Sequence, residues 1–200
     1  MPGFLQATCI GQPVHVFLQK GAVWLKTRVI MDASAMERAI TRITYEILER
    51  NKGTEGVCLV GIFSRGAVLA KRISEKIQAL EHVTVPCGAL DITPYRDDKK
   101  DSDLPEKTRI DFDINGMRVV IVDDVICTGR TTRAAIDALI TRGRPDCIQL
   151  AALVDRGHRE LPIRPDYVGK NLPTSGEETV RVKMTELDNA DGVFLYAEEG

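Results

Sequence analysis

The chain has 200 residues, of which 44% are hydrophobic and 28% charged, the composition of an ordinary globular protein of about one to one and a half domains. Its 27 Lys and Arg against 29 Asp and Glu leave a formal net charge of -2. This balance excludes a protein held on nucleic acid or an anionic membrane by its overall charge, so such binding requires a local basic patch. Aromatic residues make up only 5%, which argues against a broad base-stacking surface.

Cysteine and histidine usage points to a reduced protein without a zinc site. The 5 cysteines form no C-x-x-C pair, and the 3 histidines are scattered. We therefore expect mostly buried, reduced thiols and a cytoplasmic location. The chain has no basic-then-apolar leader and no apolar run near ~18 residues, so the sequence predicts neither a signal peptide nor a membrane span.

Residues 1–27 differ in pattern from the rest of the chain. Two apolar runs, 13–18 and 22–25, flank a Lys20-Gly21 turn signal. The pattern predicts an N-terminal extension, either disordered or folded as a small hairpin, and a single domain over residues 28–200.

A helix is predicted to begin at Asp32 or Ser34 and to end near Gly53. Either residue is a good N-cap, and Glu37 stands at capping-box distance from Ser34. The apolar face repeats at steps of three and four residues, at Met36, Ala39, Ile40, Ile43 and Ile47. The polar face carries Arg38, Thr41, Arg42, Tyr45 and Glu49.

Strand and helix signals then alternate. Val57–Ile62 is an apolar run typical of a strand covered on both faces, and a Ser64-Arg65-Gly66 turn and a helix over 67–77 follow it. Further elements are a helix over 131–140 and strands over 83–92, 118–122, 148–154, 180–187 and 193–196. This alternation predicts an α/β fold with a mostly parallel central sheet flanked by helices.

Residues 93–109 form a dense charge run with little to bury. Such a run is usually a solvated loop, and a loop is predicted here. Its length within a compact domain leaves a mobile functional arm as the alternative.

One stretch carries the chemistry: Val119, Val120, Ile121, Val122, Asp123, Asp124, Val125, Ile126, Cys127, Thr128, Gly129, Arg130, Thr131 and Thr132. It consists of a buried strand, an acid pair at the strand's carboxyl end, a turn with glycine and hydroxyls, and a helix start. Ligands of open α/β sheets bind at that edge. Backbone N–H groups, threonine hydroxyls and the helix dipole suit a phosphate, whereas the acid pair suits sugar hydroxyls, Mg²⁺ or a developing positive charge.

Other phosphate-binding patterns fit this stretch less well. A Walker A loop needs Gly-Lys-Ser/Thr and a dinucleotide fingerprint needs G-x-G-x-x-G, and both are absent. A structural alternative is a strand that ends in Asp before a Thr-capped helix, with no ligand. The combination of an apolar run, Asp-Asp and Thr-Gly-Arg-Thr-Thr is more specific than that alternative requires.

The stretch resembles the 5-phosphoribosyl-1-diphosphate (PRPP) loop of type I phosphoribosyltransferases. Residues 61–66 resemble that family's diphosphate-holding loop, and 91–98 resemble the base of its flexible catalytic arm. Residues 154–164 and 167–171 resemble the PyrR subfamily in particular. The resemblance implies a type I phosphoribosyltransferase fold from about residue 28 onward, with a small hood and a flexible catalytic loop.

By this resemblance, Asp123 and Asp124 hold the ribose 2- and 3-hydroxyls and support an oxocarbenium-like transition state. Thr128 to Thr132 wrap the 5-phosphate, and Ser64 and Arg65 contact the diphosphate together with Mg²⁺, which is held by PRPP and by the acid pair. Arg96 closes over the diphosphate and completes the catalytic set. The base is expected near Val154, Asp155, Lys170 and Asn171.

The PyrR resemblance further implies a uracil phosphoribosyltransferase that also regulates pyrimidine operons. It implies binding to the leader mRNA under the control of UMP or UTP, with transcription termination as the outcome, and a homodimer or larger homo-oligomer with no membrane contact. Candidate RNA-binding residues are Arg38, Thr41, Arg42, Tyr45, His158, Arg159, Arg164 and Lys170.

Two other functions remain open at this point. One is a phosphoribosyltransferase of nucleobase salvage with no RNA role, and the other is a regulator without catalysis, which the retained Asp123, Asp124, Arg65 and Arg96 disfavour. Four positions depart from the usual PyrR pattern: Tyr45 replaces His, Ser64 replaces Thr, Pro94 replaces Leu and Cys127 replaces Tyr. Ser64 keeps the hydroxyl, whereas Tyr45 changes the proposed RNA face.

Overall fold

The computed structural model describes residues 14–16, 25–97 and 107–198. The chain divides into two compact units, one formed by its two ends, up to Met36 and from Ser175, and the other by Glu37–Thr174. Most of the predicted N-terminal extension and the middle of the charged run over 93–109 lie outside the described residues.

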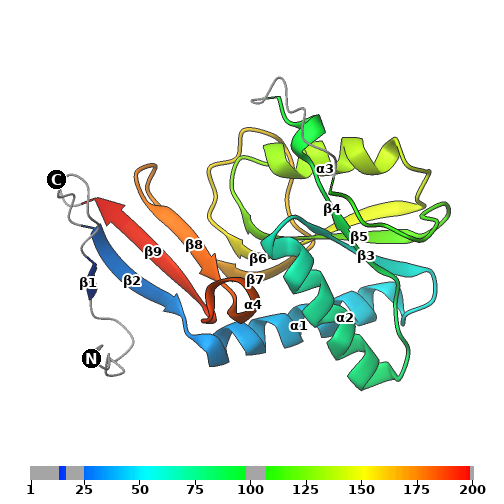
Figure 1. Ribbon diagram of the computed structural model, residues 1–200, viewed down its shortest axis with the longest axis horizontal. Coiled ribbons are helices and arrows are strands. Elements are labelled where there is room, and N and C mark those ends of the chain that lie inside the picture. The colour runs from blue at the N-terminus through cyan, green and yellow to red at the C-terminus, as the bar shows by residue number, and fades with distance from the viewer. Residues whose placement is uncertain (1–13, 17–24, 98–106, 199–200) are drawn as a thin grey trace. The chain divides into compact units, whose positions relative to one another are not determined.

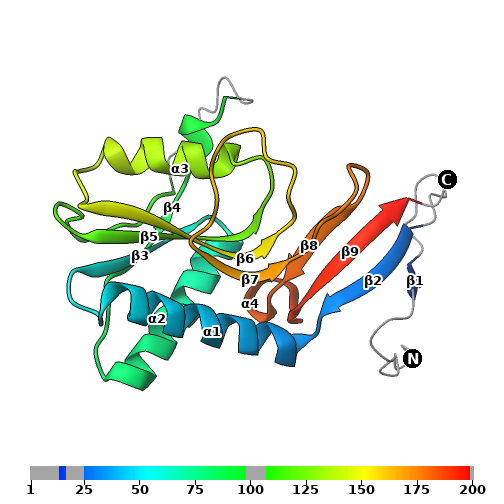
Figure 2. The same ribbon diagram turned by 180° about the vertical axis from the view of Figure 1, so that it is seen from behind.

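The larger unit is built on a five-stranded parallel sheet (Figure 1). Its strand order is β4 (Cys87–Leu90), β3 (Val57–Ile62), β5 (Arg118–Ile126), β6 (Cys147–Asp155) and β7 (Tyr167–Asn171). Figures 1 and 2 show helix α3 (Arg130–Ile140) on one face, and α1 (Ala33–Asn51) and α2 (Arg65–Glu81) on the other. The predicted α/β fold with a parallel sheet flanked by helices is confirmed.

The central strand is apolar on both faces because both faces are covered. In β5, Val119, Val120, Ile121 and Val122 are all at most 1% exposed. Val119 and Ile121 pack in one cluster with Ala134, Ala135, Ala138 and Leu139 of α3. The small alanines let the helix approach the sheet closely, which holds the start of α3 beside the end of β5.

The first helix confirms its predicted start. The Asp32 carboxylate accepts a hydrogen bond from the Ala35 N–H at 2.7 Å, so Asp32 rather than Ser34 is the cap. The helix ends at Asn51, and the Gly53 N–H donates to the Leu48 carbonyl at 2.9 Å. Its apolar stripe, including Met36, Ile40 and Ile47, is fully buried.

Two strand predictions in the larger unit are wrong in extent. The strand over 83–92 covers only Cys87–Leu90, because Pro86 has no N–H to donate and residues Thr93–Tyr95 turn into a short 3-10 helix, η1. Strand β5 extends past Val122 to Ile126, so the acid pair lies within the strand. Strand β7 was not predicted, since Gly, Lys and Asn in its sequence have low strand propensity.

The smaller unit is an antiparallel sheet of order β1 (Val14–Val16), β2 (Leu25–Met31), β9 (Gly192–Glu198) and β8 (Thr179–Lys183). The predicted strand over 180–187 is wrong beyond Lys183, because the Asp188 carboxylate accepts the Met184 N–H at 3.0 Å and starts the short helix α4 (Thr185–Asp188).

The described cysteines are all free thiols. The expectation of mostly buried thiols holds for Cys58 but is wrong for Cys87 and Cys147, which are exposed at or near the ends of strands. Within the described ranges, no helix combines the length and apolar character needed to cross a lipid bilayer.

Candidate functional site

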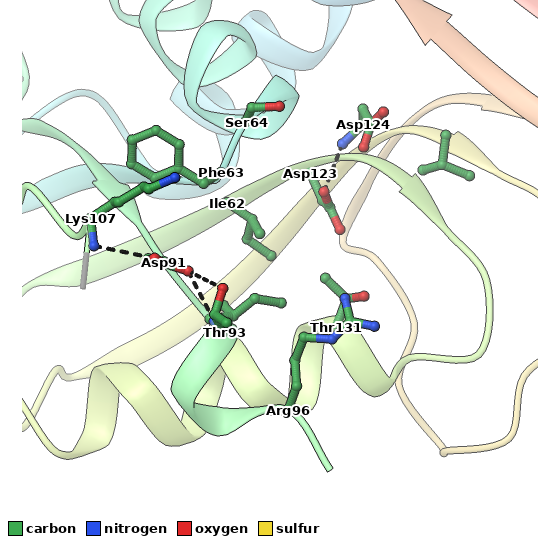
Figure 3. Close-up of a pocket in the computed structure, with 12 residues that line it drawn as sticks. Ile62, Phe63, Ser64, Asp91, Thr93, Arg96, Lys107, Asp123, Asp124 and Thr131 are labelled. Atoms are coloured by element: carbon green, nitrogen blue, oxygen red, sulfur yellow. Dashed lines mark hydrogen bonds between the residues drawn. The ribbon is translucent and has the colours of Figure 1, made fainter. Parts of the chain in front are cut away.

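The carboxyl ends of the parallel strands meet at one edge of the larger sheet and line a pocket of about 410 Å³ (Figure 3). Ser64 follows β3, Asp91 follows β4, and Asp123 and Asp124 belong to β5. The lining residues are Ile62, Phe63, Ser64, Asp91, Ile92, Thr93, Arg96, Lys107, Asp123, Asp124, Val125 and Thr131. This arrangement brings together the predicted diphosphate loop, acid pair and arm root, which are far apart in sequence.

The acid pair is held by the backbone that carries it. Asp123 is only 6% exposed, and its carboxylate accepts the Asp124 N–H at 3.0 Å. Burial, reinforced by the neighbouring Asp124 charge, raises the pKa of Asp123 well above its ordinary value. Burial also raises the pKa of Asp124, although the nearby Arg65 cation opposes this. Two adjacent carboxylates with raised pKa values in a pocket are typical of a functional site.

Close backbone packing sets the start of α2 against the acid pair. A Cβ atom on Gly66 would lie 2.3 Å from the Val122 carbonyl oxygen, so only glycine fits at this contact. Val122 directly precedes Asp123, and Gly66 directly follows Arg65. The contact therefore fixes the distance between the predicted diphosphate loop and the acid pair.

The predicted phosphate loop turns directly from β5 into α3. Gly129 has φ +91° and precedes the first helical residue, Arg130. The Thr128 hydroxyl accepts the Arg130 N–H at 3.3 Å, and Thr131 lines the pocket. Thr132 is 1% exposed and points inward, and its hydroxyl has no hydrogen-bond partner among the described residues. The loop thus presents the N-terminus of a helix to the pocket, as a phosphate site requires.

The Asp91 carboxylate joins the two described ends of the charged run over 93–109, which we call the arm. This carboxylate accepts the Thr93 N–H at 2.9 Å, the Thr93 hydroxyl at 2.6 Å and the Lys107 N–H at 3.2 Å. Burial opposes ionisation, but these hydrogen bonds outweigh it and lower the pKa of Asp91. Asp91 therefore ties together the two ends of the arm, whose middle part lies outside the described residues.

Arg96 is another of the residues that line the pocket (Figure 3). Beside it, Asp97 forms an ion pair with Arg130 at 2.9 Å, which connects the arm root to the phosphate loop. Phe63 and Lys107 also line the pocket but were not predicted as site residues. No local sequence pattern marks Lys107 as a site residue. A hydrogen bond from its backbone N–H to the Asp91 carboxylate brings it to the pocket.

The candidate base-binding residues form two neighbouring pairs at the same sheet edge. In the β6–β7 register, Val154 lies opposite Lys170 and Asp155 opposite Asn171. Val154 is fully buried and Lys170 is exposed. A second pocket of about 370 Å³ is lined by Asp155, Arg156, Gly157, His158, Asn171, Pro173 and Thr174.

One member of the second group of candidate RNA-binding residues, Lys170, lies beside α1, which carries the first group. Arg42 on α1 donates hydrogen bonds to the carbonyls of Val168, at 3.0 Å, and Gly169. Gly169 directly precedes Lys170, so the polar face of α1 lies along β7. Tyr45 is 53% exposed on this face. Exposed residues of the combined set are Arg38, Arg42, Tyr45, His158, Arg164 and Lys170.

Arg159 differs from the rest of that set. Its side chain is only 19% exposed and pairs with the Asp155 carboxylate at 2.6 Å. It also donates to the carbonyls of Cys127 at 2.7 Å and Ile163 at 2.8 Å. The prediction that Arg159 lies on an RNA surface was made from its charge, and charge does not reveal that this guanidinium points toward the Cys127 and Ile163 carbonyls.

The acid pair is the part of the pocket suited to a divalent cation. Asp123 and Asp124 supply hard carboxylate oxygens, and Mg²⁺ in proteins is commonly held by one or two carboxylates together with substrate phosphates. No group of three or more His, Cys, Asp or Glu side chains that would hold a metal gathers in the described ranges.

Comparison with known proteins places the whole arrangement in one family. Residues 27–187 match the family described as Phosphoribosyl transferase domain. The bifunctional protein PyrR of Caldicellulosiruptor saccharolyticus is 58% identical over 173 residues, covering 85% of this chain and 95% of that protein. The bifunctional protein PyrR of Listeria monocytogenes serotype 4a is 56% identical over 176 residues, covering 85% and 96%.

Solved structures support the fold. A hypoxanthine phosphoribosyltransferase from Staphylococcus aureus superposes with a TM-score of 0.64 at 17% identity, covering 86% of this chain and 92% of that one. A Trypanosoma cruzi hypoxanthine phosphoribosyltransferase gives 0.66 at 18% identity, covering 82% and 92%. With the sequence matches to the PyrR proteins over most of their length, the chain belongs to the phosphoribosyltransferase family and, within it, to the PyrR proteins.

Proposed function

We propose that this protein catalyses the transfer of the phosphoribosyl group of PRPP to uracil, giving UMP and diphosphate, and regulates pyrimidine genes by UMP-dependent binding to leader mRNA. The observation that carries the proposal is the buried acid pair directly before a phosphate loop, in a chain 58% identical to a bifunctional PyrR protein. As a PyrR family member, the protein is a PRPP-using transferase.

The geometry supports a specific placement of PRPP. The start of α3 with Thr128 and Thr131 would hold the 5-phosphate, and Asp123 and Asp124 would accept hydrogen bonds from the ribose hydroxyls. Ser64 and Arg65, set by the Gly66 contact, would face the diphosphate, with Arg96 closing the mouth. Negative charge beside C1 would stabilise the cation-like transition state as the C1–O bond breaks.

Phosphoribosyltransferases use PRPP with Mg²⁺, and the residues here fit that ion. The ion, when bound, neutralises diphosphate charge and assists its departure. The carboxylates of Asp123 and Asp124 would help to hold the ion together with PRPP. The charged arm, tied at its root by Asp91, would exclude water from the reacting centre.

RNA binding is supported by the surface that α1 and β7 form together. Lys170 is far from the α1 residues in sequence, and the Arg42 contacts to β7 bring it beside them. A confined patch of this kind can bind RNA although the whole chain carries a charge of -2. The proposal includes a homodimer or larger assembly. It also includes a cytoplasmic location, which suits the free thiols.

Turnover of uracil tests the catalytic half. Purified full-length protein with labelled uracil, PRPP and Mg²⁺ should form UMP and diphosphate, and chelation with EDTA should abolish the product. Hypoxanthine in place of uracil is the control for base choice. Conversion of hypoxanthine without conversion of uracil would favour the salvage alternative, which the PyrR relatives at 55–58% identity do not favour.

Arg38→Ala tests the RNA surface, because Arg38 is exposed on α1. The variant should weaken leader-RNA binding and reduce the slope of log K against log salt by about 1, as expected for one lost phosphate contact. Arg144→Ala, an exposed arginine after α3, is the matched control and should leave both unchanged. Equal loss in the two variants would contradict a localised surface. Filter binding at several salt concentrations measures both quantities.

A further inference from the structure

The loop that follows β6 packs against the phosphate loop. We call residues 155–163 the bracing segment. The Arg156 N–H donates to the Ile126 carbonyl at 3.1 Å, and the Glu160 and Leu161 N–H groups donate to the Thr128 carbonyl at 3.0 and 3.1 Å. Backbone groups of one segment thus hold the phosphate loop at two points, Ile126 and Thr128.

Arg159 holds the residue between those two points. Its Nη1 donates to the Cys127 carbonyl at 2.7 Å and to the Gly157 carbonyl at 3.2 Å, and its Nε donates to the Ile163 carbonyl at 2.8 Å. Its Nη2 donates to the Asp155 carboxylate at 2.6 Å. One guanidinium therefore joins the start and end of the bracing segment to the phosphate loop.

The second carboxylate oxygen of Asp155 adds a further hydrogen bond within the bracing segment. This oxygen accepts the Gly157 N–H at 3.0 Å, so both oxygens of a half-buried acid are used. Further along, Glu160 forms an ion pair with Arg130 at 2.6 Å, at the start of α3. Side chains of Leu161 and Ile163 lie 3.5 Å from the position of a Cβ on Gly129. The phosphate loop therefore cannot move far unless the bracing segment moves with it.

This placement separates Arg159 from its neighbours His158 and Arg164, which are exposed. A partly buried arginine whose donors are spent on carbonyls and an acid has little left to offer RNA. Hydrogen bonds from a charged donor are stronger than those from a neutral donor, so losing the Cys127 contact would let the phosphate loop leave its binding geometry. Loss of the Arg159–Cys127 hydrogen bond should therefore lower the affinity of the loop for a phosphate group.

We propose that Arg159 is a positioning residue for the phosphate loop, which holds the Cys127 carbonyl and thereby sets the affinity for the 5-phosphate of PRPP and UMP. The phosphate ligand itself rests on the proposed function, whereas the tie between Arg159 and Cys127 does not.

The rate at which Cys127 is alkylated tests the Arg159–Cys127 hydrogen bond, and the measurement needs no ligand. Full-length protein is treated with iodoacetamide, and the labelling rate of each cysteine is followed by peptide mass spectrometry. Arg159→Ala should raise the Cys127 rate several-fold, and Arg159→Lys, which keeps the charge, should give an intermediate rate. Arg144→Ala is the matched control. Cys58 is buried with its pKa raised to about 12, so its protection shows that each variant is folded.

Calorimetric titration with UMP measures the consequence. Arg159→Ala should weaken UMP binding about tenfold or more, with Arg159→Lys between it and the native protein. Unchanged Cys127 labelling with Cys58 protected, or unchanged UMP affinity together with lost RNA binding, would overturn the proposal and make Arg159 a direct RNA contact. Native protein that binds no UMP would contradict the proposed function instead, and the labelling would still decide on the tie.

Discussion

Asp123→Asn should lower the rate of UMP formation by about a hundredfold to a thousandfold, because loss of one preorganised electrostatic group in an active site has an effect of this size. Asparagine keeps the volume of the side chain and an oxygen to accept the Asp124 N–H. The change therefore removes charge from beside the ribose and leaves the backbone arrangement in place. Steady-state assays with uracil and PRPP measure the rate, and Asp146→Asn on an exposed loop is the control.

The same substitution should raise the thermal midpoint. Burial raises the pKa of Asp123, so its ionised form is less favourable in the folded than in the unfolded chain, and this cost is present above the folded pKa. Asparagine removes the cost, and about 1 kcal/mol gained corresponds to about 2–4 °C in a domain of this size.

The stability gain should depend on pH with a defined sign. It should be largest above the raised pKa of Asp123 and should shrink on acidification, reaching zero below the ordinary pKa, where the aspartate is protonated in both states. Scanning calorimetry of both proteins across the acid range measures this. An Asp123→Asn protein that is less stable than the native chain at neutral pH would contradict the account of a strained acid pair.

Gly66→Ala should disrupt both stability and PRPP binding. The new Cβ would meet the Val122 carbonyl oxygen at 2.3 Å, far inside contact distance, and the obstacle is backbone that cannot rotate away. Overpacking of this kind costs about 1–3 kcal/mol. We expect a thermal midpoint about 2–12 °C lower, at about 2–4 °C per kcal/mol for a domain of this size. We also expect a raised KM for PRPP, because Arg65 would move away from Asp124.

Gly176→Ala is the matched control for this contact. Gly176 has open space where a Cβ would stand, so alanine should leave the thermal midpoint and KM close to those of the native protein. Differential scanning fluorimetry and PRPP saturation curves give the two quantities. A Gly66→Ala protein with native stability and native KM would show that α2 and β5 can separate without harm to the site.

Much of the site could be predicted because it is contiguous in sequence. Asp123, Asp124 and the phosphate loop follow one another along a strand, a turn and a helix start, and each step has a local signal. The buried strand Val57–Ile62 and the α1 stripe were visible for the same reason, since both depend on periodicity within one element.

Long-range contacts explain what was missed. Arg159 carries a surface type of charge, but its direction is set by the Cys127 carbonyl 32 residues earlier. Lys107 reaches the pocket through its backbone N–H and the Asp91 carboxylate, which local sequence does not encode. Strand β7 is specified by pairing with β6 rather than by its own propensity. These features depend on tertiary packing, which overrides local preference.

Binding of native protein to a pyrimidine leader RNA, with and without UMP, tests the central claim most directly, because it joins the phosphate loop and the RNA surface in one measurement. UMP should tighten RNA binding, and the affinity should fall steeply as salt increases. An unrelated RNA hairpin of equal length should show neither strong binding nor a UMP effect. Equal affinity for the leader with and without UMP would contradict a regulator that senses the nucleotide at its phosphoribosyltransferase site.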